Sequence, residues 1–324
     1  MKKMTLQVRD LCTSFFTDKG EIKAVNNVSF DVPKRGIIGI VGESGCGKSM
    51  TARSVMRLIK YPGRIVSGSI TLEGKELTRL TESEMANVRG EEISMIFQEP
   101  MTSLNPVMKA GRQVQEVVML HRKVSKKEAR AEVLRMFEKV GISEPEKRYE
   151  CYPHELSGGL RQRVMIAMAM ICRPKLLIAD EPTTALDVTV EAQILELMRN
   201  LRDEIGTSIM LISHNLGVVA EICDYVHVMY AGRVVEQAET FELFDNPRHP
   251  YTIGLMNAVD SLERKQAVLD TIPGTVPNLL GLGEGCSFAP RCGRRTGRCD
   301  QMSELVEVVP GHLVRCHCHR QEVR

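Results

Sequence analysis

The chain has 324 residues, of which 43% are hydrophobic, and its formal net charge is +2 at pH 7. A chain of this size and apolar content can bury a sizeable core, which argues against intrinsic disorder. The near-neutral charge argues against a protein that binds nucleic acid over its whole surface. The first residues include lysines but no apolar segment, so we expect no secretory signal. No apolar run approaches the ~20 residues that span a bilayer, so we expect any membrane role to depend on another chain.

The predicted elements alternate between strands and helices along most of the chain. The apolar run 36–41 predicts a strand buried on both faces, and a glycine-rich turn then opens a helix. Residues 107–149 are predicted to be mainly helical, with a capping box at 125–128. The apolar runs 176–179 and 209–212 predict two more buried strands, each followed by polar residues. This alternation predicts an α/β fold with a mainly parallel sheet, whose ligands bind at the carboxyl ends of the strands.

The glycine-rich turn reads GESGCGKS and matches the phosphate-binding P-loop in its expected strand-to-helix context. Its glycines leave backbone N–H groups open to triphosphate oxygens, and the following helix N-terminus favours an anion. Lys48 is predicted to contact the β- and γ-phosphates, and the Ser49 hydroxyl to bind Mg²⁺. The loop amides and Lys48 are expected to favour the thiolate of Cys46. The predicted nucleotide-binding residues of this turn are Gly42, Glu43, Ser44, Gly45, Cys46, Gly47, Lys48 and Ser49.

Side chains that suit phosphate hydrolysis follow other apolar runs. Asp180 and Glu181 end the run that begins at Leu176. Asp180 is expected to hold Mg²⁺, and Glu181 to polarise the attacking water. Gln98 carries an amide able to meet both metal and water, and His214 closes another strand at the same predicted edge of the sheet. The predicted catalytic residues are therefore Glu181, His214 and Gln98, with Ser49, Gln98 and Asp180 around Mg²⁺.

A second anion-receptive helix N-terminus is predicted where a serine and two glycines precede a helix that starts near residue 160. Taken alone, this pattern favours an ordinary capped helix start. With the P-loop, Gln98, the Asp180–Glu181 pair, residues 185–187 and His214 in that order, this segment resembles the ABC ATPase family over roughly residues 5–258. The resemblance implies that these are the Walker A, Q-loop, signature, D-loop and switch-histidine motifs. It also implies that the signature residues contact the nucleotide, namely Ser157, Gly158, Gly159 and Leu160.

The resemblance implies an α/β P-loop NTPase fold with a RecA-like core, an antiparallel β subdomain and a helical subdomain over about 99–172, all within residues 1–258. It also implies that Phe15 (or Phe16) stacks on adenine. The family's usual glutamine after the signature glycines is Leu160 in this chain, which we expect to cost little because the backbone amides and Ser157 carry the phosphate contact. Two such domains are implied to face each other head to tail, with ATP between one partner's P-loop and the other's signature.

Further segments resemble a narrower group within this family. Residues 99–106, 248–252, 272–278, 285–288 and 291–292 resemble the ATPases of oligopeptide and dipeptide importers. That resemblance implies peptide uptake through two transmembrane permease subunits, an extracellular substrate-binding protein, a similar second ATPase subunit, no nucleic acid, and a peripheral position on the cytoplasmic face of the cell membrane. A nickel or metal-chelate importer ATPase is an alternative. A soluble ABC protein that acts on ribosomes or nucleic acid is an alternative of another class, disfavoured by the single ATPase domain and near-neutral charge.

Residues 259–324 are predicted to form a small cysteine-rich extension. Its cysteines lack the close pairs of structural zinc sites, although four thiolates can hold an iron–sulfur cluster. Arginines among them are expected to favour thiolates. The subfamily resemblance implies a [4Fe–4S] cluster whose ligands are Cys286, Cys292, Cys299 and Cys316, with Cys318 spare. Zinc, with His317 and His319 among the candidate ligands, and free thiols are the alternatives.

Overall fold

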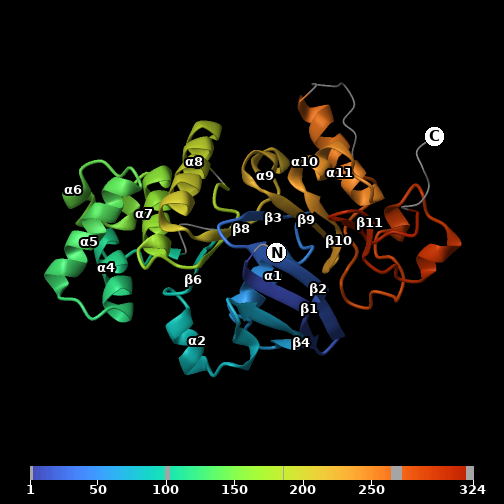
Figure 1. Ribbon diagram of the computed structural model, residues 1–324, viewed down its shortest axis with the longest axis horizontal. Helices are drawn as coiled ribbons and strands as arrows, with labels where there is room; N and C mark the ends of the chain where they lie inside the picture. The colour runs from blue at the N-terminus through green and yellow to red at the C-terminus, as the bar shows by residue number, and fades with distance from the viewer. Residues whose placement is uncertain (1–2, 99–102, 185, 264–271, 319–324) are drawn as a thin grey trace. The chain divides into compact units, whose positions relative to one another are not determined.

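The computed structural model describes residues 3–98, 103–184, 186–263 and 272–318, with backbone alone for 259–263. The chain divides into two compact units, the first made of residues 1–5, 32–36 and 79–211, and the second of residues 6–31, 37–78 and 212–324. The predicted division at residue 258 lies inside α11 (Pro250–Glu263), so the cysteine-rich extension as a separate domain stays a prediction. Figure 1 labels many of the elements of both units.

The first unit combines short parallel strands with a group of helices (Figure 1). Its elements are α2 (Glu82–Val88), β6 (Ile93–Ile96), α4 (Ala110–His121), α5 (Lys126–Lys139), α6 (Pro145–Tyr149), α7 (Gly158–Met170), β7 (Leu176–Asp180), α8 (Val188–Ile205) and β8 (Ser208–Ile212), with the 3₁₀ turn η2 (Pro153–Glu155). The 3₁₀ turn η1 (Leu77–Arg79) begins in the second unit and ends at the first residue of the segment 79–211. The strands follow the order β8-β7-β6, and β6 runs parallel to β7. Helix α4 packs against α5, α6 and α7, as the helical pattern of this region predicts.

Helix α5 shows why the local sequence forms this element. Ser125 Oγ accepts the Glu128 amide at 3.3 Å, and the Glu128 carboxylate accepts the Ser125 amide at 2.8 Å. This is the predicted capping box, in which two otherwise unpaired helix donors find partners. Val133 and Phe137 bury the apolar face, and Gly141 follows the helix with φ 73°. The capping box predicted at 125–128 is therefore confirmed.

The second unit holds the remaining strands and helices. Its elements are β1 (Met4–Thr17), β2 (Gly20–Pro33), β3 (Ile37–Val41), α1 (Lys48–Val55), β4 (Gly63–Leu72), β5 (Lys75–Glu76), α9 (Leu216–Ile222), β9 (Tyr225–Tyr230), β10 (Arg233–Glu239), α10 (Thr240–Asp245), α11, β11 (Val306–Val309) and β12 (His312–Val314), with the 3₁₀ turns η3 (Ala289–Arg291) and η4 (Gly297–Asp300). One sheet has the order β2-β1-β4-β5, with β1 antiparallel to β4. This sheet matches the antiparallel β subdomain that the family resemblance implies.

The other strands of this unit follow the order β11-β12-β10-β9-β3. Every residue of β3 is buried, as its apolar run predicts, and β3 runs parallel to β9. From β9 onward the pairing is antiparallel, which differs from the mainly parallel sheet expected. For β9 and β10 the cause is the tight turn between them, where Ala231 and Gly232 have φ of 46° and 81°, because so short a link can join only antiparallel strands.

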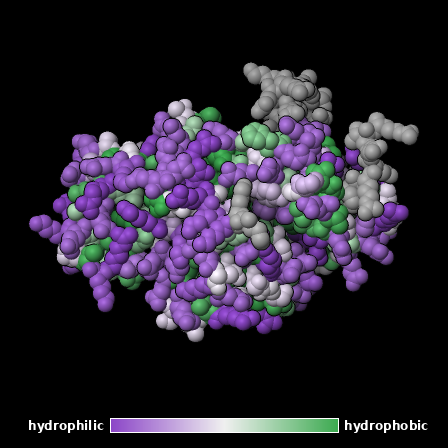
Figure 2. Space-filling view, in the orientation of Figure 1, coloured by the Kyte–Doolittle hydropathy of each residue, from purple (hydrophilic) through white to green (hydrophobic). Residues whose placement is uncertain are grey.

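The visible surface is largely polar. Figure 2 shows hydrophilic residues over most of this face, with hydrophobic ones in small separate groups. Across the described ranges, no helix is both long and apolar enough to cross a bilayer, in line with the short apolar runs of the sequence.

Candidate nucleotide site

The P-loop lies between β3 and α1, where its glycines are required by backbone geometry. Gly42, Gly45 and Gly47 have φ of 146°, 77° and 106°, values that residues with a side chain rarely adopt. A Cβ atom on Gly42 would lie 2.2 Å from the Met229 carbonyl oxygen, and one on Gly47 would lie 2.4 Å from that of Ala24. The glycine pattern read from the sequence therefore reflects left-handed backbone and close packing of the loop against neighbouring strands.

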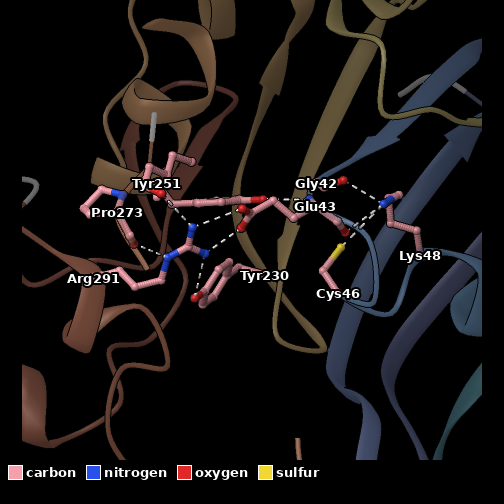
Figure 3. A network of polar contacts seen from close by, with 9 residues as sticks. Gly42, Glu43, Cys46, Lys48, Tyr230, Tyr251, Pro273 and Arg291 are labelled. Carbon is pink, nitrogen blue, oxygen red and sulfur yellow. Dashed lines mark hydrogen bonds and ion pairs between the residues drawn. The ribbon is translucent and has the colours of Figure 1, made fainter. Parts of the chain in front are cut away.

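Lys48 is anchored inside this loop. Its side chain is largely buried, and Nζ donates to the backbone oxygens of Gly42 at 2.7 Å and Glu43 at 3.0 Å (Figure 3). Nζ also lies 3.8 Å from Cys46 Sγ. Burial is the largest influence on Cys46 and raises the pKa of its thiol despite the opposing effect of Lys48. The expectation that this loop favours the Cys46 thiolate is therefore wrong, because desolvation outweighs one nearby cation.

The predicted hydrolytic residues of the first unit meet at the end of β7. Gln98 Nε2 donates to Glu181 Oε2 at 2.8 Å, and Thr184 Oγ1 donates to the same oxygen at 3.0 Å. Asp180, the last residue of β7, is 3% exposed. Glu181 has φ 48°, a strained value for a residue with a side chain that often marks a functional position. Sequence reasoning missed Thr184, which carries no motif signal of its own.

The signature segment begins α7. Ser157 is the N-cap, and its Oγ accepts the Leu160 amide at 3.4 Å. The helix starts at Gly158, slightly earlier than predicted, and its first turn contains no acidic residue. A Cβ on Gly159 would lie 3.2 Å from a Val190 methyl group. The exposed serine and adjoining glycines leave the helix N-terminus open, as an anion contact requires.

The remaining predicted site residues differ in exposure and in their contacts. His214 follows β8 and is exposed. Phe15 is partly buried, and a Cβ on Gly63 would lie 2.6 Å from its ring, whereas Phe16 is 40% exposed and stacks under Arg64. Asp187 caps α8 through the Val190 amide, while Ala185 of the predicted D-loop and residues 99–102 lie outside the described residues.

The cysteines of the C-terminal region come together. One pocket of the second unit is lined by Cys286, Cys292, Cys299, Cys316 and Cys318, together with His249, Phe288 and His317. Burial raises the pKa of Cys286, Cys292 and Cys316, the last to about 12. The expected thiolate stabilisation by arginines is therefore outweighed by burial. Within the described part of the chain, no three histidine, cysteine or acidic side chains lie close enough to count as a metal-ion site.

Known proteins resemble this chain over nearly its whole length. Residues 25–184 match the ABC transporter family, and residues 235–299 match the C-terminal region of oligopeptide/dipeptide transporters. The oligopeptide transport ATP-binding protein OppD of Salmonella typhimurium is 53% identical over 96% of this chain and 92% of its own. The dipeptide transport ATP-binding protein DppD of Bacillus subtilis is 49% identical over 97% and 92%.

A solved structure shares the fold. The ABC transporter cassette MJ0796, described as a bacterial dimer, superposes with a TM-score of 0.66 and 24% identity over 72% of this chain and 98% of its own. With the P-loop, the carboxylate pair and the capped signature helix in place, the chain belongs to the family of ATP-binding subunits of oligopeptide and dipeptide ABC transporters, which are ATPases.

Proposed function

We propose that this chain hydrolyses ATP to drive uptake of oligopeptides or dipeptides through two separate transmembrane permease subunits. The main support is that the match to peptide-transport relatives extends beyond the ATPase motifs into residues 235–299. The ATPase motifs are common to ABC proteins that do different work, whereas this C-terminal region is described from peptide transporters. The chain would act peripherally at the cytoplasmic face of the membrane, with a substrate-binding protein outside.

The residues suggest a division of roles within the nucleotide site. Lys48 and the P-loop amides would bind the triphosphate. The buried carboxylate of Asp180 and the hydroxyl of Ser49 are hard oxygen ligands of the kind Mg²⁺ prefers, so they would hold it and place its charge beside the phosphates. Glu181, held by hydrogen bonds from Gln98 and Thr184, would polarise the attacking water.

The open N-terminus of α7 suggests that a second ATPase subunit completes the site. Its Ser157 hydroxyl and glycine amides would contact the phosphates bound by the partner's P-loop. His214 would act as the switch histidine in hydrolysis, and Phe15 would stack on adenine. The dimeric state of MJ0796 supports a pair of this kind. Closing and opening of the pair would follow its different affinities for ATP and for the products.

Peptide uptake can be tested in cells that lack this chain. Restoring the chain should restore growth on a short peptide that supplies a required amino acid, and Glu181→Gln should not. Nickel accumulation measured in the same strains tests the alternative cargo. Restored nickel uptake without restored peptide uptake would refute the peptide assignment. Co-purification with ribosomes rather than membrane permeases would favour the other class of ABC protein.

We also propose that the cysteine pocket holds a [4Fe–4S] cluster through Cys286, Cys292, Cys299 and Cys316. Three of these sulfurs accept backbone N–H groups: Cys292 from Arg294, Cys299 from Thr296 and Cys316 from Cys318. Such donors suit thiolates bound to metal. A zinc site needs four ligands about 2.3 Å from one ion, whereas a cluster is larger and suits sulfurs spread around a pocket. When bound, the cluster would cross-link the extension through its cysteines.

Anaerobically purified protein should be brown and contain iron and acid-labile sulfide in equal amounts. Cys299→Ser should abolish the colour, whereas Cys151→Ser, which changes a cysteine of the first unit outside the pocket lining, should leave it. Colourless protein with one zinc per chain would overturn the cluster and favour the zinc alternative. Protein that lacks both metals after anaerobic purification would favour free thiols.

A further inference from the structure

The cysteine-rich region reaches the P-loop through Arg291. Its Nη1 donates to Glu43 Oε2 at 2.7 Å, and its Nη2 donates to Glu43 Oε1 at 3.1 Å, across 248 positions of the sequence (Figure 3). Guanidinium and carboxylate therefore form a bidentate pair, the strongest arrangement for these groups. The Arg291 side chain is 6% exposed and that of Glu43 27%, so the pair is shielded from solvent far more than a typical surface ion pair.

Arg291 is held in place by its other donors as well. Nε donates to the Pro273 carbonyl oxygen at 2.7 Å, Nη2 to that of Ile272 at 3.2 Å, and Nη1 to the Tyr230 hydroxyl at 3.3 Å. With the two bonds to Glu43, all five guanidinium N–H groups are used. The arginine is thus anchored by the C-terminal segment and β9, and its position determines where the Glu43 carboxylate lies.

The Glu43 carboxylate carries a negative charge in the loop that is predicted to bind a triphosphate, which is itself negatively charged. It belongs to the residue whose backbone oxygen accepts from Lys48 Nζ at 3.0 Å, so the side chain starts close to the cation that should meet phosphate. In Figure 3 the Glu43 side chain extends toward Arg291, away from Lys48. Without Arg291, the carboxylate would repel the phosphates and compete with them for Lys48.

We propose that Arg291 is a positioning residue of the nucleotide site, which neutralises Glu43 and holds its carboxylate away from the phosphates and Lys48. The proposal rests on the P-loop role given under Proposed function. It assigns part of the ATP affinity to the cysteine-rich region, through a residue next to one of its cysteines.

The test measures binding of a fluorescent methylanthraniloyl ATP analogue with Mg²⁺ to the full chain. Arg291→Ala should raise the dissociation constant on the order of tenfold, since it leaves an uncompensated charge beside the phosphates. In the Glu43→Gln background the same change should shift it by no more than about twofold, because no carboxylate remains to compensate. In the assembled transporter, Arg291→Ala should raise KM for ATP more than it lowers kcat.

Arg295→Ala is the matched control, because Arg295 also pairs with a carboxylate, that of Asp300, but at an exposed site in the same region. It should not change nucleotide affinity. If Arg291→Ala does not fold, Arg291→Lys keeps the charge but not the bidentate pair, and should show a smaller loss with the same dependence on Glu43.

Two results would overturn the proposal: unchanged affinity in the Arg291 variant, or a loss of equal size in the Glu43→Gln background, which would mean that Arg291 merely supports the fold. Lys48→Ala separates this from the P-loop assignment. If that variant binds the analogue like the parental chain, the nucleotide site itself is misassigned, whatever the Arg291 variants show.

Discussion

We predict that the buried side chain of His312 stabilises the pairing of the C-terminal hairpin, β11 and β12, with β10. His312 Nε2 lies 2.7 Å from Glu236 Oε1 and Nδ1 lies 3.0 Å from Glu242 Oε1, and the His312 and Glu236 side chains are fully buried. His312→Ala would leave the Glu236 carboxylate buried, where the backbone amides of Arg248 and His249 donate to it but no histidine balances its charge. Removing one partner of a buried pair costs about 3–5 kcal/mol.

That loss corresponds to roughly 150- to 5,000-fold easier local opening. Hydrogen exchange of the β11 and β12 amides measures it directly, because it reports local opening of the hairpin even where the rest of the chain stays folded. Arg295→Ala, which removes an exposed pair, serves as the control and should leave exchange unchanged. Adding Glu236→Gln to His312→Ala should recover part of the protection, since the buried charge is gone.

The same site predicts a pH effect. Burial is the largest influence on His312 and by itself would lower its pKa, but the hydrogen bonds and charges of Glu236 and Glu242 outweigh it and raise the pKa above the usual 6.5. The protonated form therefore stabilises the hairpin fully below pH 6.5, and this contribution is lost as pH rises through the folded pKa. If the β12 amides were equally protected from hydrogen exchange in the parental and His312→Ala proteins, both the stabilising role of His312 and its pH dependence would be refuted.

Three further predictions concern other parts of the chain. Glu181→Gln should slow ATP turnover by the assembled transporter about 10²- to 10⁴-fold while nucleotide still binds; near-parental turnover would remove its role. Gly111→Ala would put a Cβ atom 2.1 Å from the ring of Tyr149, the last residue of α6. This clash should lower the free energy of unfolding in urea by about 1–3 kcal/mol. A Cβ atom at Gly283 would meet no atom within 4 Å, so Gly283→Ala is the control and should change the free energy of unfolding little. Burial lowers the pKa of His227 and His249 to about 4. As the pH is lowered from 6.5 to 4, the unfolded chain gains protons that the folded histidines do not bind, so the free energy of unfolding should fall by about 1.4 kcal/mol per pH unit for each histidine. A urea midpoint that stays constant over this range would contradict the prediction.

Features that depend on a few neighbouring residues could be predicted from the sequence. The capping box at Ser125 and the glycines of the P-loop are of this kind, because hydrogen bonding within one turn and backbone dihedral angles are set by residue type. The buried strands β3, β7 and β8 were likewise readable from continuous apolar runs. The catalytic roles drawn from these motifs stay predictions.

Features that depend on packing could not be read in the same way. The expected Cys46 thiolate was wrong because the sequence shows the neighbouring cation but not the burial that opposes it. The antiparallel pairing from β9 to β11 was missed because an apolar run carries no information on strand direction. Thr184 was missed because a threonine beside a turn has many uses, and its bond to Glu181 appears only in the folded chain.

The sequence by itself determined the class of protein, since motif order and spacing specify a P-loop, an acidic strand end and a signature helix capped by Ser157. Only the tertiary structure decided which distant residues complete them. Arg291 meets Glu43, and His312 meets Glu236, because folding of the second unit brings charges from far apart in the chain into surroundings where each needs a partner. Burial and pairing of charge depend on the whole fold, and no local pattern encodes them.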